Sequence, residues 1–444
     1  MTIYGLSKRE ARERLVKGRV TIAVYGLGKM GLPLACVFAD KGAQVIGIDV
    51  DQKIVDNLNK GINHVTEEPG LSAMLARVLN AKRFRATTDA VAAAKESNVQ
   101  VILIPTLLTK DYKPEMKPLE QLCEKIAEGM RKGSVVISEC TMPPGSTEQL
   151  IPFLEKRGLK CGRDFGLAHC PERTMTGTAI RDIEGQYPKV VGACNKETLE
   201  PVCGLYEAIN SKGVIPVSSI KAAECVKVFE GVYRDVNIAL ANELALYCDR
   251  IGVDAIEVFK TANTQPYCHL HTPGPGVGGH CIPVYPYFIM SEQTPITRAA
   301  RKYNDWMREH VVELAEQALK EKGKNIKGAN VLVLGLTFRG GVRAYYNTAA
   351  EPVIALLKKK GANVYAFDPL STDEDYARFG VKKSQEYSEM DCVVVLADHA
   401  EFRSYDWSAI IKNLRTKAVV DARQALDPEF ARKQGAAIKS IGRI

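Results

Sequence analysis

The sequence lacks any long hydrophobic run. No segment reaches the run of about 18 consecutive apolar residues that a membrane-spanning helix needs, so we expect no membrane partner. The start of the chain, residues 1–19, is basic and lacks the apolar core of a secretory leader. It predicts a short amphipathic helix ahead of the first strand instead. We therefore expect a cytoplasmic protein.

The sequence also lacks paired Cys-x-x-Cys spacing, although it contains 12 cysteines. This absence argues against a disulfide framework and for free thiols, as is usual in the cytoplasm. Several of the cysteines lie in apolar or helical surroundings and are interpreted as small core residues. They are Cys36, Cys123, Cys140, Cys225 and Cys248.

Basic residues are scattered rather than clustered, although the formal net charge is +8. Without a basic stripe or a nucleic-acid motif, this charge predicts a solvated surface, and we expect no nucleic-acid partner. The content of 46% hydrophobic and 25% charged residues is ordinary for a globular protein. A chain of 444 residues has room for two or three domains, each with its own core.

A dinucleotide-binding fingerprint lies near the start of the chain. An apolar strand at residues 20–25 is followed by Gly-x-Gly-x-x-Gly, an apolar helix, and a second strand at 45–48 that ends at Asp49. The glycines allow a tight turn and a close approach to a pyrophosphate, and Asp49 can bind the ribose hydroxyls. Since an acid would repel a 2′-phosphate, the pattern favours NAD over NADP. The residues of this fingerprint predicted to bind NAD are Gly26, Gly28, Lys29, Met30, Gly31 and Asp49.

Two further strands should border the same crevice. Residues 99–104 lead into Pro105 and Thr106, and residues 135–138 lead towards Thr141. In open α/β sheets the carboxyl ends of the strands line the ligand crevice. We therefore add Pro105, Thr106 and Thr141 to the predicted NAD-binding residues.

The pattern of residues 42–49 recurs far downstream. Residues 361–368 repeat Gly-Ala-x-Val followed by an aspartate, and residues 331–336 before them look like another first strand. The last third of the chain is therefore predicted to be a second Rossmann-like unit. Its turn at 335–340 lacks the three-glycine spacing, so it should bind a different nucleotide or none.

Long helical segments lie between the two repeats. Residues 219–250 and 297–322 carry apolar residues at helical spacing. The predicted fold class is α/β, with two Rossmann-like doubly wound domains joined by a long central helix, and that helix predicts a homodimer. We divide the chain into an NAD-binding domain at 1–216, a central helical segment at 217–322 and a C-terminal domain at 323–444.

A single cysteine ends a glycine-rich loop in the central segment. Residues 273–283 read Pro-Gly-Pro-Gly-Val-Gly-Gly-His-Cys-Ile-Pro. A thiol near a nicotinamide ring indicates chemistry that an ordinary alcohol dehydrogenase does not need, because Cys281 can capture an aldehyde so that it is oxidised a second time. The backbone N–H groups of Gly276, Gly278 and Gly279 can approach a substrate that side chains would block.

Taken together, these segments resemble the UDP-glucose/UDP-mannuronate dehydrogenase family over residues 20–407. The loop sequence around His280 and Cys281 looks like the branch that oxidises UDP-N-acetylated amino sugars. The resemblance implies an NAD-dependent four-electron oxidation of a C6 hydroxyl to a carboxylate, with the C-terminal domain binding the UDP-sugar. The segments that carry it are residues 26–31, 68–71, 105–106, 141–145, 171–173, 227–244, 278–283, 335–339 and 397–399.

The resemblance also implies roles for single residues. Cys281 would form a thiohemiacetal and then a thioester, Lys227 would stabilise oxyanion character, and Glu172 with Thr141 would hold the hydrolytic water. Glu172 is the candidate base for hydrolysis. The residues implied to bind the substrate are Glu172, Arg173, Lys227, Gly276, Gly278, Gly279, His280 and Arg339.

Three positions depart from the family pattern. Four residues after the lysine the family usually has asparagine, and this chain has Gly231. Four residues after the cysteine many members have aspartate, and this chain has Tyr285. An arginine often seen in the last domain is replaced near Tyr346. Because Cys281 and Lys227 remain, we interpret the chain as an active but divergent member.

Alternative interpretations stay open. Cys268, His269, His271, His280 and Cys281 lie close together in the sequence and could form the zinc site of a two-electron alcohol dehydrogenase. Their spacing fits no standard zinc pattern, so we predict no metal. The chain could also bind NAD and a sugar nucleotide without turnover, as a regulator. UDP-N-acetyl-D-mannosamine is the expected substrate, with UDP-N-acetylglucosamine and UDP-glucose as alternatives.

Overall fold

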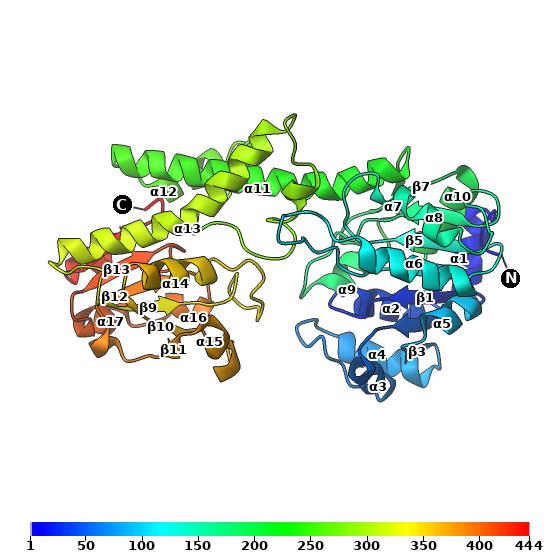
Figure 1. Ribbon diagram of the computed structural model, residues 1–444, viewed down its shortest axis with the longest axis horizontal. Coiled ribbons are helices and arrows are strands. Elements are labelled where there is room, and N and C mark those ends of the chain that lie inside the picture. The colour runs from blue at the N-terminus through cyan, green and yellow to red at the C-terminus, as the bar shows by residue number, and fades with distance from the viewer. Residues whose placement is uncertain (1, 444) are drawn as a thin grey trace. The chain divides into compact units, whose positions relative to one another are not determined.

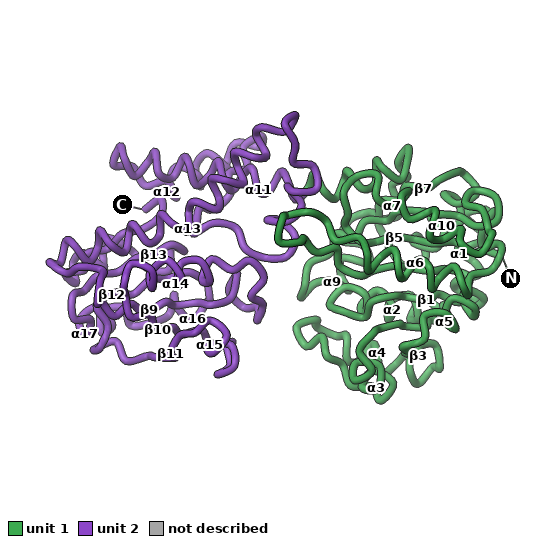
Figure 2. The backbone as a smooth tube through the Cα atoms, viewed as in Figure 1, with its two compact units in different colours: residues 1–230 green, residues 231–444 purple. Residues whose placement is uncertain are grey.

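The computed structural model describes residues 2–443 of the chain. The chain divides into two compact units, residues 1–230 and residues 231–444 (Figure 2). The long helix α11 (Ile220–Ile251) contains the boundary between them, close to the predicted helix at 219–250. Each unit is described by itself below.

Unit 1 is built on an eight-stranded sheet of order β3-β2-β1-β4-β5-β6-β7-β8 (Figure 1). The first six strands in this order follow the doubly wound arrangement of dinucleotide-binding domains. All neighbours are parallel except β6 and β7, which are antiparallel. The strands are β1 (Thr21–Tyr25), β2 (Gln44–Ile48), β3 (Phe84–Thr87), β4 (Val99–Ile102), β5 (Val135–Ser138), β6 (Gly166–His169), β7 (Lys189–Ala193) and β8 (Val214–Pro216).

The helices of unit 1 begin where their sequences supply caps. Ser7 and Glu10 form a capping box on the first helix, and Asp51, Asp89 and Asn195 each accept a backbone N–H at the start of a later helix. The helices are α1 (Lys8–Val16), α2 (Gly31–Asp40), α3 (Gln52–Asn59), α4 (Leu71–Asn80), α5 (Ala90–Glu96), α6 (Lys117–Gly129), α7 (Ser146–Gln149), α8 (Ile151–Leu154), α9 (Ala179–Arg181), the π-helix η1 (Asp182–Gln186) and α10 (Lys196–Glu207).

Unit 2 carries a six-stranded parallel sheet of order β11-β10-β9-β12-β13-β14, which is the same doubly wound order. Its strands are β9 (Asn330–Leu334), β10 (Asn363–Phe367), β11 (Lys382–Lys383), β12 (Cys392–Val395), β13 (Ala418–Asp421) and β14 (Ala437–Ser440). The fold class predicted from the sequence, two Rossmann-like domains with a long helix between them, is confirmed.

The long helix α13 contacts β12, β13 and β14 of this second sheet (Figure 1). Its buried side chains, Met307, Val311, Ala315 and Leu319 among them, recur at helical spacing and form one core with β9 and β12. The other helices of unit 2 are α12 (Ala255–Ala262), the 3₁₀ turn η2 (Tyr285–Phe288), α13 itself (Pro295–Glu321), α14 (Ala350–Lys359), α15 (Asp373–Phe379), the 3₁₀ turn η3 (Tyr387–Glu389), α16 (Ala400–Arg403), α17 (Trp407–Asn413) and α18 (Pro428–Lys433).

The internal repeat is visible in atomic detail. In unit 1 the strand register pairs Tyr25 with Ile48, which sets the glycine turn beside Asp49, and the Leu27 N–H donates to that carboxylate at 3.0 Å. In unit 2 the register pairs Leu334 with Phe367, and the Leu336 N–H donates to the Asp368 carboxylate at 2.7 Å. The two turns therefore share one construction, as the sequence repeat predicted.

The cysteines are unbonded thiols throughout the described chain. Cys36, Cys123, Cys140 and Cys248 are buried, as predicted for small core residues. The prediction is wrong for Cys225, which is only half-buried at its position on α11. Of the helices described, none is long and apolar enough to cross a membrane.

One face of α11 is apolar and exposed. Tyr233, Leu240, Tyr247 and Ile251 are each about half exposed, and their spacing places them on a single stripe of the helix. A stripe of this kind is typical of a surface that another chain covers. It fits the predicted homodimer, which stays a prediction.

A buried acid near the end of α11 makes the stability of unit 2 depend on pH. Asp249 accepts the Gly442 N–H at 3.4 Å with one oxygen, and its other oxygen is buried without a partner among residues 2–443. Burial, supported by the negative charge of Asp254 and opposed by the Gly442 hydrogen bond, raises the pKa of Asp249 to about 6. The folded-state pKa is thus above the unfolded value of about 3.9. The stability from this group is complete below about pH 4 and is lost as the pH rises through about 6.

We predict that Asp249→Asn stabilises the protein near neutral pH and above, because the amide cannot ionise. The gain should be on the order of 1 kcal/mol at about pH 8, after allowance for partial exposure of the group, and should be much smaller at about pH 5. Thermal unfolding of both proteins at the two pH values measures it. Asp427→Asn is the control, because the Phe430 N–H lowers the pKa of Asp427 and its loss should destabilise most at high pH. A pH-independent change in Asp249→Asn would contradict the prediction.

Candidate functional site

The glycine turn of unit 1 has no room for side chains at two of its three glycines. Gly26 has a φ of +96°, and a Cβ there would lie 2.5 Å from the Leu103 carbonyl oxygen. A Cβ at Gly31 would lie 1.8 Å from the Gly26 carbonyl oxygen. At Gly28, in contrast, a Cβ would meet nothing within 4 Å. The missing side chain of Gly28 therefore leaves open space at the start of α2, where the helix N-terminus favours a phosphate.

Other residues of this edge also fit a dinucleotide. Asp49 is held at the turn by the N–H groups of Leu27 and Asp51, at 3.0 and 3.1 Å, and stays partly exposed. Pro105 is exposed, and Thr106 is buried with a hydroxyl that has no partner within residues 2–443. A buried hydroxyl without a partner is costly in an apo protein and is satisfied by a ligand. The residues present therefore fit bound NAD.

Lys29 and Met30, between the glycines, make contacts within unit 1. The Lys29 ammonium lies 2.7 Å from the Glu67 carboxylate, and both side chains are partly exposed. The Met30 sulfur accepts the Thr174 hydroxyl at 3.0 Å. Met30 therefore joins the fingerprint to the segment after Glu172, which is a second predicted part of the site.

The segment that begins at Thr141 is fastened to α11 by a glutamate that sequence reasoning missed. Glu224 is buried and accepts the Gly145 N–H, the Thr147 N–H at 2.8 Å and the Thr147 hydroxyl at 2.6 Å. Burial raises the pKa of Glu224, against these hydrogen bonds. Lys227 is half-buried three residues later on the same helix, hence on the same face. One helical turn thus carries both the anchor of the Thr141 segment and the predicted catalytic lysine.

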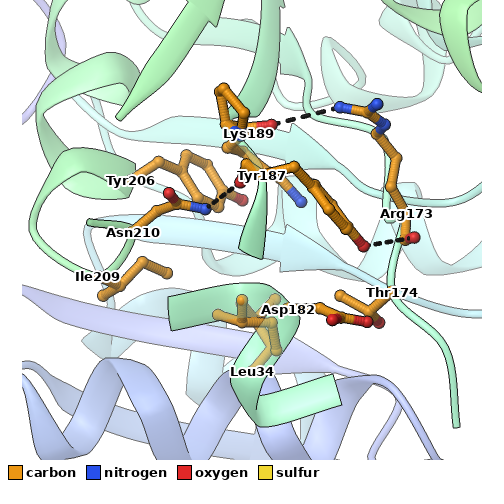
Figure 3. A pocket seen from close by; sticks show the side chains of 11 residues that line it. Leu34, Arg173, Thr174, Asp182, Tyr187, Lys189, Tyr206, Ile209 and Asn210 are labelled. Atoms are coloured by element: carbon orange, nitrogen blue, oxygen red, sulfur yellow. Dashed lines mark hydrogen bonds between the residues drawn. The ribbon is translucent and has the colours of Figure 1, made fainter. Parts of the chain in front are cut away.

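Glu172 and Arg173 are held by the loop and sheet around them. A Glu172 carboxylate oxygen accepts the Thr174 N–H. The Arg173 guanidinium pairs with Glu230 at 2.7 Å and donates to the Pro188 carbonyl at 3.3 Å. Figure 3 shows the small cavity beside them, in which the Tyr187 hydroxyl donates to the Arg173 carbonyl at 2.6 Å. Arg173 therefore has partners within unit 1, and its contact with substrate stays a prediction.

A buried ion pair lies directly behind Glu172. The Glu139 carboxylate is fully buried, lies 2.6 Å from the Lys189 ammonium and accepts the Tyr206 hydroxyl. Burial raises the pKa of Glu139, and Lys189 opposes that rise. The Glu172 N–H donates to the Glu139 carbonyl at 3.3 Å, so this pair braces the backbone of the predicted base. Its only sequence signal was an acid directly after β5.

In unit 2 the loop that leads to Cys281 is fixed by side chains of two helices. Asn242 of α11 accepts the Gly274 N–H at 2.8 Å, and Arg308 of α13 donates to the Val277 carbonyl at 3.0 Å. Gly276 has a φ of +99°, and a Cβ there would lie 2.5 Å from the Asn304 carbonyl oxygen. Asn242 and Arg308 are functional candidates that sequence reasoning missed, because their partners are backbone atoms far along the chain.

The next glycines pack against the C-terminal sheet's first turn. A Cβ at Gly278 would lie 2.7 Å from the Cβ of Phe338, and a Cβ at Gly279 would lie 3.2 Å from the Phe338 ring. The Gly279 N–H donates to the Tyr346 carbonyl at 2.7 Å. The Tyr346 ring also meets His280 edge-on, with the ring centroids 5.6 Å apart. Burial lowers the pKa of His280. Tyr346, one of the departures from the family pattern, is thus a contact of the cysteine loop.

The cysteine itself begins a tight turn. Cys281 is exposed, and its carbonyl accepts the N–H groups of Val284 and Tyr285 at 3.1 and 3.0 Å. Tyr285 is buried, and a Cβ at Gly231 would lie only 2.4 Å from its ring. The other two departures are therefore one coupled change, because the tyrosine ring fills the space that a side chain on α11 would need.

Arg339 follows Phe338 at the end of the same turn of unit 2. It is half-buried, its guanidinium lies 5.8 Å from the centre of the Phe338 ring, and its Nε is buried without a partner among the described residues. A buried guanidinium nitrogen of this kind suits an anionic or polar ligand. By contrast, Asp368 is enclosed. Burial acts to raise the pKa of its carboxyl group, but His399 and backbone N–H groups outweigh burial and lower that pKa to about 2. It is therefore not available to a ribose as Asp49 is.

The cluster of sulfur and imidazole groups around Cys281 does not assemble into a metal site. Within residues 2–443, no three His, Cys, Asp or Glu side chains lie close enough to hold a metal ion. The cysteine loop is instead organised by backbone hydrogen bonds to Asn242, Arg308 and Tyr346.

Comparison with known proteins places these features in one family. Three consecutive segments match the UDP-glucose/GDP-mannose dehydrogenase family: its NAD binding domain at residues 20–210, its central domain at 221–306 and its UDP binding domain at 332–428. The NAD prediction is therefore confirmed at the level of the domain.

Curated relatives and a solved structure agree. A UDP-N-acetyl-D-mannosamine dehydrogenase of Pyrococcus horikoshii is 36% identical over 91% of this chain and 96% of its own length. An NDP-N-acetyl-D-galactosaminuronic acid dehydrogenase of Ralstonia nicotianae is 33% identical over 91% of this chain and 95% of its own. The structure of a UDP-D-ManNAc dehydrogenase from Pyrococcus horikoshii is 33% identical with a TM-score of 0.88, covering 95% of this chain and 99% of that one. The chain therefore belongs to the UDP-glucose/GDP-mannose dehydrogenase family, whose motifs its sequence carries in order.

Proposed function

We propose that this NAD-dependent enzyme oxidises the C6 hydroxyl of UDP-N-acetyl-D-mannosamine to the carboxylate. The observation that carries the proposal is the exposed thiol of Cys281, set at the end of a loop whose glycines let its backbone pack closely against Asn304 and Phe338. The choice of sugar is supported by relatives that carry this name and align over nearly the whole chain. UDP-N-acetylglucosamine and UDP-glucose remain the alternatives that an experiment must separate.

The residues of unit 1 hold the cofactor and move protons. When bound, NAD would be the hydride acceptor in both oxidation steps. The turn from Gly26 to Gly31 and Asp49 bind it through the phosphates and ribose, and the Thr106 hydroxyl gains a partner on binding. Lys227 stabilises the alkoxide that develops as the C6 hydroxyl loses its proton.

Cys281 prevents escape of the aldehyde. Its sulfur adds to the carbonyl carbon and its proton passes to the carbonyl oxygen, which gives a thiohemiacetal that still carries one C–H and one O–H bond. Loss of a hydride from that carbon and of a proton from its hydroxyl group leaves a thioester. Water then adds to the thioester carbonyl with Glu172 accepting its proton, the C–S bond breaks, and the thiol and carboxylate are released. Two hydrides therefore leave each sugar.

Arg339 and the cysteine loop supply the substrate contacts of unit 2. The Nε of Arg339, which has no partner in the part of the chain that the structure describes, is suited to the sugar nucleotide, and the N–H groups of the loop are suited to the sugar. The Tyr346–His280 contact closes one side of this loop. Because partial burial lowers the pKa of His280, it acts as a neutral group near pH 7.

A panel of UDP-sugars tests the proposal. With UDP-N-acetyl-D-mannosamine the purified enzyme should reduce two NAD per sugar and release the uronate, measured by NADH absorbance and mass spectrometry of the product. Cys281→Ser should still bind the sugar but lose carboxylate formation by about three orders of magnitude or more.

Cys268→Ser is the matched control, because Cys268 is half-buried and lies near the same loop in the sequence. It should keep the stoichiometry of two. One NAD per sugar would indicate a two-electron enzyme, and tight binding of NAD and sugar without turnover would indicate a regulator. A faster reaction with UDP-glucose than with either acetamido sugar would contradict the proposed substrate.

The Gly231–Tyr285 contact generates a second test. Gly231→Asn should destabilise the protein by about 1–3 kcal/mol, because its side chain enters the space of the Tyr285 ring, and should lower kcat by displacing Cys281. Tyr285→Asp should also lower stability by emptying that space. The double variant should recover much of both losses. Thermal unfolding and kcat of all four proteins measure the coupling, and losses that simply add would refute a shared contact.

A further inference from the structure

Two cysteines of unit 1 that the proposed reaction does not use lie against each other. Cys161 precedes β6 and bridges to Phe165, and Cys194 directly follows β7, where its N–H donates to the Leu167 carbonyl at 2.9 Å. The two cysteines are neighbours in space, although 32 residues separate them in the sequence. Cys194 is exposed and Cys161 is half-buried, so solvent reaches the pair.

The backbone on either side of the pair is fastened together. The residue after Cys194, Asn195, donates from its side chain to the carbonyl of Gly162, the residue after Cys161, at 3.1 Å. The Tyr4 hydroxyl donates to the same carbonyl at 2.6 Å and accepts from Asn195 at 2.9 Å. These bonds hold the two thiols side by side without a covalent link.

The surroundings of Cys194 favour its thiolate. Its sulfur accepts the Leu167 N–H at 3.4 Å, lies 3.3 Å from the Thr198 hydroxyl, and stands just before the N-cap of α10. Helix N-termini stabilise thiolates. The hydrogen bond from Cys161, with those from Thr198 and Leu167, outweighs burial and lowers the pKa of Cys194 to about 6. The same contact raises the pKa of Cys161.

Buried cysteines of the same unit are in the opposite situation. Burial raises the pKa of Cys36 to about 12 and that of Cys203 to about 11, and it raises the pKa of Cys123 as well. Such thiols are inert towards oxidants and disulfides. The pair also lies at the amino end of β6, whereas the glycine turn and Asp49 follow the carboxyl ends of β1 and β2 in the same parallel sheet. It is therefore separate from the cofactor edge.

We propose that Cys161 and Cys194 form a dithiol site that reacts with low-molecular-weight disulfides, such as oxidised glutathione, and closes reversibly to an intramolecular disulfide. Cytoplasmic disulfides are usually transient and redox-sensing, and an exposed thiolate beside a second thiol is the arrangement that such sites use.

The exchange balances in two steps. The Cys194 thiolate attacks one sulfur of oxidised glutathione and the S–S bond of glutathione breaks. One glutathione leaves as a thiolate, and the other stays bound to Cys194 as a mixed disulfide. Cys161 then loses its proton and attacks the Cys194 sulfur, which expels the second glutathione. The protein loses two electrons and two protons, and oxidised glutathione is reduced to two thiols. Excess reduced glutathione reverses both steps.

The closed form should be more stable than the open form. The new bond would link the segment before β6 to the start of α10. It would close a loop in the unfolded chain and so lower the conformational entropy of the unfolded state. Since the hydrogen bonds of Asn195 and Tyr4 already hold the two backbones, little rearrangement is needed. Binding of NAD at the opposite edge of the sheet should be unchanged.

Peptide mapping of the full-length protein after titration with mixtures of oxidised and reduced glutathione tests the proposal. Non-reducing digestion and mass spectrometry should find a Cys161–Cys194 cross-linked peptide, lost again in excess reduced glutathione, with a melting temperature several degrees higher in the closed form. Cys161→Ser should stop at glutathione bound to Cys194, and Cys194→Ser should form neither product.

Cys203→Ser is the control, because Cys203 is a buried thiol on the neighbouring helix and its loss should leave the cross-link intact. Alkylation of both Cys161 and Cys194 after the oxidising treatment would overturn the proposal, as would a stable mixed disulfide in the wild type without closure. Since the readout is a map of disulfide-linked peptides, the result is independent of which sugar the enzyme oxidises and of whether Cys281 is catalytic.

Discussion

The close contact between Gly231 and the Tyr285 ring is the constraint on which the turn that begins at Cys281 depends. A tyrosine packed against bare helix backbone fixes the residue four positions after Cys281, and the Tyr285 N–H in turn holds the Cys281 carbonyl. The thiol can then stay exposed while the backbone beneath it stays rigid. Family members with asparagine and aspartate at these positions lack this contact between a glycine and a tyrosine ring.

The two Rossmann-like units show how one construction serves two ligands. Both turns place an aspartate against the N–H of the residue after the first glycine. In unit 1 a glycine at position 28 leaves space for phosphate, and Asp49 stays partly exposed. In unit 2 Thr337 takes the equivalent place and, with His399, encloses Asp368. The Nε of Arg339, at the end of the same turn, lacks a protein partner within the described chain.

Local patterns predicted the elements well because they depend on neighbours in the chain. The helix expected at 219–250 is Ile220–Ile251, and both β1 and β2 lie within a residue of their predicted bounds. The contacts that organise the site were not predictable in this way. Glu224 holding Gly145, and Asn242 holding Gly274, join segments far apart in the sequence, and each looks like an ordinary polar helix residue. The departures at Gly231 and Tyr285 were visible singly, but only their contact in space shows that they are one change.

The cysteines show why residue type alone says little about reactivity. Most are buried in one of the two cores, where desolvation keeps the thiol protonated and inert. Cys281 differs because a glycine loop exposes it, and Cys194 differs because a helix start, a hydroxyl and a second thiol surround it. Two reactive sulfur sites in one chain would interfere if they met. Cys281 belongs to unit 2, whereas the pair lies at the amino edge of the sheet in unit 1. The proposed exchange depends on Cys194 having a second thiol beside it that can displace glutathione from the mixed disulfide.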